Sequence, residues 1–181
     1  MFLLAFFLLG ISQSFAQSKE NVWEVGIRNS WINRNASINT GYSLGAFVNH
    51  QMTIFDNSNW LLINELGYEK LITESDPNQP LFWYQNALRY RIVIARKFNY
   101  LSHQFFAGLG PSFMYGKQLM GGVRINGEFF NPNYQRELSY GPSISLSYKN
   151  KVVSDRLGVR FDFEVLEQNR VVGFSLLYSI K

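Results

Sequence analysis

The chain has 181 residues, a formal net charge of +4 at pH 7 and no cysteine. This length fits one domain, and the lack of cysteine excludes a disulfide scaffold and a thiolate metal site. Aromatic residues make up 17% of the sequence, which favours strands over helices. The basic residues form no run, which favours scattered solubilising charge, and nucleic acid is not an expected partner of a chain that is exported.

The first 16 residues differ from the rest. Phe2–Ile11 is an unbroken apolar run, and Ser14-Phe15-Ala16 provides a small-x-small cleavage site before a polar segment. The run is too short to span a membrane as a helix. We therefore expect a signal peptide over residues 1–16 that is cleaved on export, and a single domain over residues 17–181.

From Asn21 onward, polar and apolar residues alternate with a period of two, which is typical of β-strands. The alternating segments are Asn21–Ile32, Ile38–Met52, Trp60–Lys70, Leu81–Lys97, His103–Lys117, Leu138–Tyr148, Val153–Val165 and Val172–Ile180. Short polar turns separate most of them. Thr73–Pro80 is a longer loop, and Lys117–Gln135 is rich in Gly and Asn and predicted to be irregular.

Most of these segments have about ten or more residues, whereas strands of soluble proteins usually have five or six. Long strands in an even number, joined in sequence by hairpins, suit a barrel that crosses a membrane at a tilt. The sequence therefore predicts an all-β fold, an eight-stranded antiparallel up-and-down transmembrane β-barrel.

Aromatic residues recur at an interval of eight on the apolar face of three segments. The pairs are Trp23 and Trp31, Trp60 and Tyr68, and Tyr140 and Tyr148. Eight steps of about 3.3 Å, tilted by roughly 40°, span about 20 Å along the bilayer normal. This approaches the apolar band of about 25 Å between the aromatic girdles of such barrels. We interpret these six residues as girdle residues.

The lengths of the connections predict an orientation. Periplasmic turns are short in outer-membrane barrels, and external loops are longer. With the N-terminus in the periplasm, the turns near Asp56, Asn99 and Asn150 are periplasmic, while Thr73–Pro80 and Lys117–Gln135 are external.

Three stretches, Leu62–Tyr68, Phe106–Phe113 and Phe174–Ile180, resemble the small outer-membrane β-barrels of Gram-negative bacteria, the OmpA/OmpX-like and PorT-like group. The resemblance covers nearly all of Asn21–Lys181 as a pattern. It implies a barrel in the outer membrane that the barrel assembly machinery inserts. Because members of the group differ widely in role, it implies no particular activity.

The polar parity collects charged residues of both signs. They are Glu24, Glu65, Glu69, Asp162 and Glu164 together with Arg28, Arg89, Arg91, Arg156 and Arg160. The interior of an eight-stranded barrel is just wide enough for side chains to fill it. Arginine–carboxylate pairs are therefore the expected filling of the lumen. The alternative is a gated conduit or a carboxylate catalyst, and an open ion pathway would show an excess of one sign.

Two other sets of residues are candidates for chemistry or binding. His50 and His103 are the general bases of the usual kind, but both lie on the outward parity at the periplasmic end, where an interfacial role is expected. In Lys117–Gln135, the residues Arg124, Phe129, Phe130 and Tyr134 are candidates for an external binding loop. A mobile rim, or strands extended beyond the membrane, is the alternative there. We expect no catalytic residue, metal or cofactor.

The leading hypothesis is a monomeric, non-enzymatic outer-membrane barrel with a packed polar lumen and a structural or surface-interaction role. Its expected partners are outer-membrane lipid and lipopolysaccharide. The alternatives are a barrel enzyme that modifies lipid A, a narrow pore, and a soluble exported barrel of the lipocalin kind. The last of these needs an apolar interior, with the charged parity facing solvent.

Overall fold

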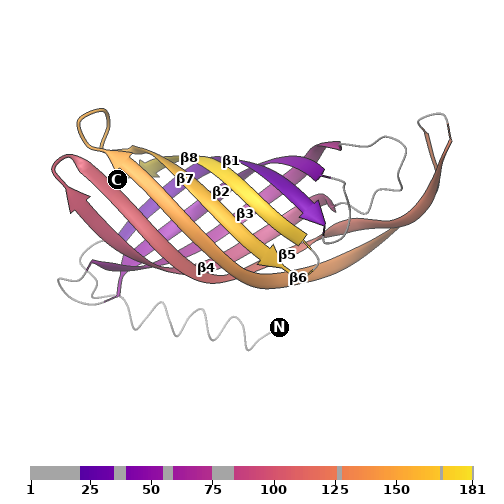
Figure 1. Cartoon of the computed structure of the whole chain (residues 1–181), viewed down its shortest axis with the longest axis horizontal. Coiled ribbons are helices and arrows are strands. Elements are labelled where there is room, and N and C mark those ends of the chain that lie inside the picture. The colour runs from indigo at the N-terminus through magenta and orange to yellow at the C-terminus, as the bar shows by residue number, and fades with distance from the viewer. Residues whose placement is uncertain are drawn as a thin grey trace.

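The computed structural model describes residues 21–34, 40–54, 59–74, 84–125, 128–167 and 169–180, which form one closed antiparallel barrel (Figure 1). Each strand pairs with its neighbours in the sequence, and β1 closes the barrel by pairing with β8. The predicted eight-stranded up-and-down architecture is confirmed. The strands are β1 (Asn21–Arg34), β2 (Thr40–Thr53), β3 (Trp60–Glu74), β4 (Tyr84–Tyr100), β5 (His103–Ile125), β6 (Glu128–Asn150), β7 (Leu157–Leu166) and β8 (Asn169–Ile180).

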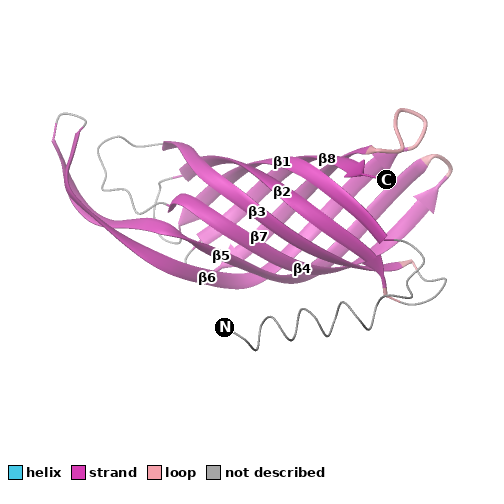
Figure 2. Cartoon of the chain, turned by 180° about the vertical axis from the view of Figure 1, so that it is seen from behind, coloured by secondary structure: helices cyan, strands magenta, loops and turns pink. Residues whose placement is uncertain are grey.

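The barrel has two ends that differ in their connections. The terminal end is where β1 begins and β8 ends, and it carries the β2–β3, β4–β5 and β6–β7 connections. The far end carries the other four connections, the β5–β6 connection among them (Figures 1 and 2). Residues 1–20 lie outside the described part of the chain, so the signal peptide stays a prediction.

The turns at the terminal end are compact. Only Leu101 and Ser102 separate β4 from β5, and Leu101 has a positive φ of 52°. The backbone N–H of Lys151 donates to the carbonyl of Ser102 at 2.9 Å, which ties the β6–β7 turn to the β4–β5 turn. The predicted start of β7 at Val153 is wrong. Val153 lies in the turn and β7 begins at Leu157, because the backbone N–H of Ser154 folds back onto the carbonyl of Asn150.

The prediction that Lys117–Gln135 is irregular is also wrong. β5 and β6 run through most of this segment as strands of 23 residues each, and the pairing extends from Lys117↔Arg136 to Ile125↔Glu128. β4 accompanies β5 only as far as Gln118, so beyond that point β5 and β6 pair only with each other. The resulting hairpin extends past the other strands (Figure 2). Its alternation is weak because this part of the sheet encloses no lumen.

In the barrel wall, the described side chains alternate between the lumen and the outer surface along each strand. In β7 the burial pattern alternates almost perfectly, and it does so also in β8. On β6, Ser143 and Ser145 face inward and are buried, while Ile144 and Leu146 face outward and are 53% and 56% exposed. The barrel is thus polar inside and apolar outside over most of its wall. No helix in the described ranges has the length and hydropathy of a membrane span.

Candidate functional site

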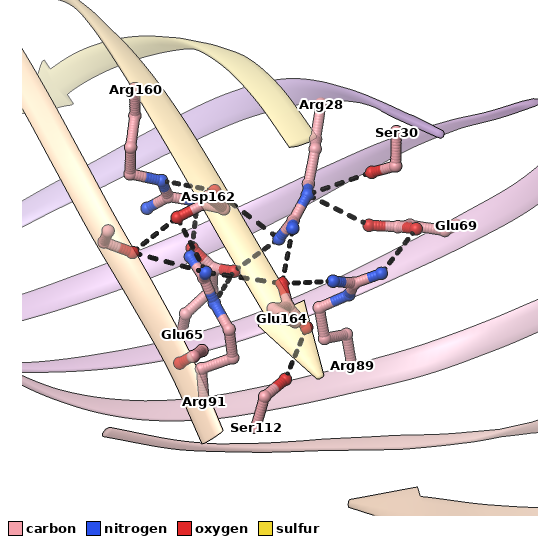
Figure 3. A network of polar contacts seen from close by, with 12 residues as sticks. Arg28, Ser30, Glu65, Glu69, Arg89, Arg91, Ser112, Arg160, Asp162 and Glu164 are labelled. Atoms are coloured by element: carbon pink, nitrogen blue, oxygen red, sulfur yellow. Dashed lines mark hydrogen bonds and ion pairs between the residues drawn. The ribbon is translucent and has the colours of Figure 1, made fainter. Parts of the chain in front are cut away.

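The lumen holds a network of buried ion pairs. Ten charged side chains are buried there, five carboxylates and five cations. They are Glu24, Glu65, Glu69, Asp162 and Glu164 with Arg28, Arg89, Arg91, Lys149 and Arg160. Figure 3 labels all of them except Glu24 and Lys149, and its hydrogen bonds and ion pairs cross from one wall of the barrel to the other. Equal numbers of the two signs leave the described lumen without an excess of charge.

Glu164 on β7 is the centre of the half of the network nearer the far end. Its Oε1 accepts from Arg28 on β1 and from Arg89 on β4, and its Oε2 accepts from Ser112 Oγ at 2.7 Å. Arg89 also donates to Glu69 Oε2 at 2.9 Å. Because β1, β4 and β7 lie on different sides of the barrel, these contacts close the lumen.

A second group lies next to the first along the barrel axis. Arg91 binds both oxygens of Glu65, at 2.8 and 3.0 Å, and its Nη1 lies 2.7 Å from Asp162 Oδ1. Arg160 donates to Asp162 Oδ2 at 2.9 Å and also to Glu65. The guanidinium carbon of Arg160 sits 4.5 Å from the ring centroid of Phe47, which adds a cation–π contact.

Glu24 forms a third group at the terminal end. It accepts from Lys149 Nζ, from Gln51 and from Ser179 Oγ, the last at 2.9 Å. Lys149 was not predicted to face the lumen, because it stands beside Asn150 and Lys151 and was assigned to the turn. Lys149 has the same parity as Ser145 and Ser147 along β6, and this parity is the sequence signal for a side chain that faces the lumen.

Apolar side chains fill the lumen beside the third group. Leu61, Ile63, Val93, Ala95 and Phe106 form a buried cluster on the inner faces of β3, β4 and β5. A cavity of about 10 Å³ borders this cluster and Arg91, which is about the space of one water molecule. The apolar layer inside the barrel was not predicted, although Leu61 and Ile63 share the parity of Glu65 and could have been identified from it.

Two glycines make room for large inward side chains. A Cβ on Gly173 would lie 2.5 Å from Arg28 Nε, and one on Gly26 would lie 2.3 Å from the ring of Phe47. Gly26 and Phe47 are register partners on β1 and β2, so the aromatic ring covers the glycine. Arg28 and Phe47 can therefore occupy their places in the lumen only because these two positions carry no side chain.

Arg156 does not join the network. It precedes β7 and is exposed, and its Nη1 donates to the Tyr178 hydroxyl at 3.0 Å. That hydrogen bond, with the nearby Asp155, raises the pKa of the Arg156 guanidinium above its ordinary value. The placement differs from the prediction because the alternation was extended backward through a turn.

The two histidines lie near the terminal end among aromatic rings. His50 stacks on Trp23 with ring centroids 4.4 Å apart. His103 Nδ1 lies 2.8 Å from the Tyr148 hydroxyl, and its ring stacks on Tyr148 and Phe105. Neither ring has a serine or carboxylate partner among its described contacts. Within the described ranges, no group of three or more His, Cys, Asp or Glu is arranged to hold a metal ion.

The residues predicted as a girdle are all on the outer surface. Five of them, namely Trp23, Trp31, Trp60, Tyr68 and Tyr140, are 41% to 55% exposed, and Tyr148 is partly covered by His103 and Phe105. The candidate loop residues Arg124, Phe129, Phe130 and Tyr134 stand on the β5–β6 hairpin, and their side chains lie outside the described part of the structure.

No family model matches the sequence, and no curated protein matches it either. Solved structures do match. Ail, the attachment invasion locus protein of Yersinia pestis, is similar with a TM-score of 0.54 and 12% identity, over 88% of this chain and 97% of that chain. A second Ail structure, in complex with the heparin analogue sucrose octasulfate, gives 0.53 and 8% over 88% and 97%.

Neisserial surface protein A is similar with a TM-score of 0.57 and 11% identity, over 89% of this chain and 96% of that chain. At such low identity the likeness shows the fold alone. This chain has the architecture of a small eight-stranded barrel and spans nearly the full length of each matching structure.

Proposed function

We propose that this protein is an integral outer-membrane β-barrel with a lumen closed by side chains, serving envelope structure or surface interaction. The observation that carries the proposal is the inverted polarity of the barrel. Large apolar side chains are exposed on all eight strands, whereas the buried charged residues face the lumen. A soluble protein of this size rarely exposes an apolar patch larger than a few hundred Å², and this surface surrounds the barrel.

The closed lumen supports a structural barrel over a pore. Ion pairs between side chains of opposite sign cross the interior, and both Glu164 and Asp162 connect β7 to β1 and β4. A conduit would need continuous space and an excess of one sign of charge. We expect no stepwise conductance from the purified protein in planar bilayers.

The interior also argues against a lipocalin-like carrier, because that role needs an apolar cavity open at one end. Here the middle of the lumen is occupied by arginine and carboxylate side chains. The two histidines lie on the outer surface near the terminal end, which under the proposed orientation faces the periplasm. An enzyme acting on lipid A in the outer leaflet would need its catalytic residues at the far end. We expect lipid A from cells with the protein and from cells without it to give identical mass spectra.

The β5–β6 hairpin supports a surface-interaction role. It continues past the rest of the barrel as paired strands, so it presents a two-stranded extension at the far end. The matching Ail structure contains a heparin analogue, which for this chain offers an anionic saccharide as one class of partner for that extension. We place the far end at the cell surface, because it carries the long connections, and we expect a monomer.

The test is whether the mature chain, residues 17–181, behaves as a membrane barrel. We expect it in the outer-membrane fraction, extractable only with detergent, with an unheated gel mobility that differs from that of the boiled sample. A mature chain that is monodisperse without detergent would contradict the proposal.

A further inference from the structure

Three basic residues and one asparagine form an outward row across four strands at the far end. Lys70 on β3 is the register partner of Asn86 on β4, Asn86 is the partner of Lys117 on β5, and Lys117 is the partner of Arg136 on β6. The three cations are exposed. With strands about 4.8 Å apart, the row is about 14 Å long. This row, Lys70–Asn86–Lys117–Arg136, is called the basic row below.

The acidic residues beside the basic row have the opposite parity. Glu69 precedes Lys70 and points into the lumen, where it contacts Arg89 and Ser43. Glu137 follows Arg136 and also stands on the inward parity. The three cations of the basic row therefore lie on the outer side of the wall, and Lys117 and Arg136 bring like charges together on adjacent strands. An anion that binds from outside would be attracted to all three cations.

An apolar row lies directly below. Two residues along each strand toward the terminal end, the partners are Tyr68, Leu88, Tyr115 and Leu138. All four are between 44% and 51% exposed. The basic row thus marks the boundary at which the outer wall changes from polar to apolar, and a ligand held there contacts both surfaces.

An apolar groove begins at this boundary. It has a volume of about 690 Å³, and its lining includes Tyr68 and Leu88 at one end and Leu157 at the other. The small Ala46 side chain lies between Ile27 and Tyr68 on neighbouring strands, which makes the depression. No charged residue lines the groove.

We infer that the outer wall binds a phosphate-bearing lipid, with its phosphate groups on the basic row and an acyl chain in the groove. The inference rests on the proposed membrane location. A lipid fits better than a soluble polyanion because the cations adjoin an apolar surface on the side of the barrel and continue into an apolar groove. A soluble polyanion would bind the cations alone and would have no use for the apolar surface beside them. Diphosphoryl lipid A has both chemical parts and is the probe.

The experiment measures lipid A binding to the folded mature protein in zwitterionic micelles by native mass spectrometry. Each cation beside an anionic lipid contributes about a fivefold factor, so we expect the triple variant K70Q/K117Q/R136Q to bind about 100-fold more weakly. The control R96Q/K151Q/R170Q removes the same charge from exposed positions outside the basic row and outside the groove, and should change binding by less than about threefold on the same reasoning.

A matched pair of variants tests the groove. Ala46→Phe fills the groove and is expected to weaken lipid A binding about tenfold, since it displaces a few methylene groups of the chain. Ala107→Phe makes the same change on the outer face of β5, outside the groove, and should leave binding unchanged. Unheated gel mobility confirms that each variant is a folded barrel.

Three outcomes would overturn the inference. The triple variant binds lipid A like wild type, or wild type binds lipid A no better than phosphatidylcholine, or sucrose octasulfate binds as tightly as lipid A while Ala46→Phe binds both like wild type. The last result would assign the basic row to a soluble polyanion. In each case a folded, detergent-dependent barrel would leave the proposed function intact, and a mature chain soluble without detergent would remove that function instead.

Discussion

Glu164 shows how single residues close the lumen. Its carboxylate faces Arg28 and Arg89 and accepts a hydrogen bond from Ser112, with all four side chains buried. A buried ion pair is not in itself more stabilising than well-packed apolar groups, but removing one partner leaves the other charge buried without compensation. The network therefore makes the barrel sensitive to the loss of any one carboxylate.

Glu164→Gln keeps the shape of the side chain and removes its charge. We expect it to lower the free energy of unfolding by about 3–5 kcal/mol, because the arginines around it lose their counter-charge. Urea unfolding in detergent micelles, followed by gel mobility, measures the change. Glu137→Gln makes the same substitution outside the network and should change stability by less than about 1 kcal/mol. Equal stability of the two variants would contradict the central role of Glu164.

Gly173 tests the fit between the wall and the network. An added Cβ would meet the Arg28 guanidinium at 2.5 to 2.9 Å, and that group is held by its carboxylate partners. We expect Gly173→Ala to destabilise the barrel by about 1–3 kcal/mol, the usual cost of overpacking. At Gly67 the nearest atom is 3.1 Å away, so Gly67→Ala should cost less. The same urea titration decides, and a reversed order would be inconsistent with a tightly filled lumen.

At the scale of elements, the β4–β5 turn carries local strain. Leu101 has a φ of 52°, a left-handed conformation that asparagine adopts more readily than leucine. Leu101→Asn should therefore stabilise the barrel by about 0.5–1 kcal/mol, seen as a higher urea midpoint. Ser102→Asn is the neighbouring control and should have no such effect, since Ser102 has no positive φ. A lower midpoint for Leu101→Asn would show that its side chain matters more than its backbone.

The β5–β6 hairpin beyond Gln118 pairs only with itself. Replacing residues 120–133 by Asn-Gly joins the register partners Leu119 and Tyr134 through a two-residue turn. We expect the shortened protein to keep its unheated gel mobility and nearly all its stability, because no lumen residue of the network is removed. Failure of this variant to form a barrel would contradict the assignment of the hairpin as an extension.

These elements also show which features of the strands sequence periodicity can predict and which it cannot. The alternation of Ser143, Ile144, Ser145 and Leu146 predicts a wall with two different sides, and the described strand has that wall. Periodicity cannot place the ends of strands. Backbone pairing can continue beyond the part of the barrel that has a lumen on one side and an apolar environment on the other, and there nothing imposes alternation. The extended strands β5 and β6 were therefore expected only as an alternative to an irregular segment, Arg156 was assigned to a strand that begins one residue later, and Lys149 was assigned to a turn.

In the whole molecule, the alternation along the strands produces a barrel whose polarity is the reverse of that of a soluble protein. The lumen has an apolar cluster near the terminal end and a charged middle, and the outer wall exposes large apolar side chains. The sequence showed the charged parity but not which charges would meet, since pairs such as Arg28 and Glu164 are far apart in the chain. Closure of β1 on β8 brings them together.

The central claim, that the apolar wall faces lipid, has a direct test because the chain has no cysteine to interfere. Single-cysteine variants at Ile144, Leu146 and Ser147 are spin-labelled, and their accessibility to oxygen and to a water-soluble nickel chelate is measured by EPR in lipid vesicles. We predict that positions 144 and 146 are accessible to oxygen and closed to nickel, while position 147, which faces the lumen, is protected from both. Access of nickel to positions 144 and 146 would contradict the account.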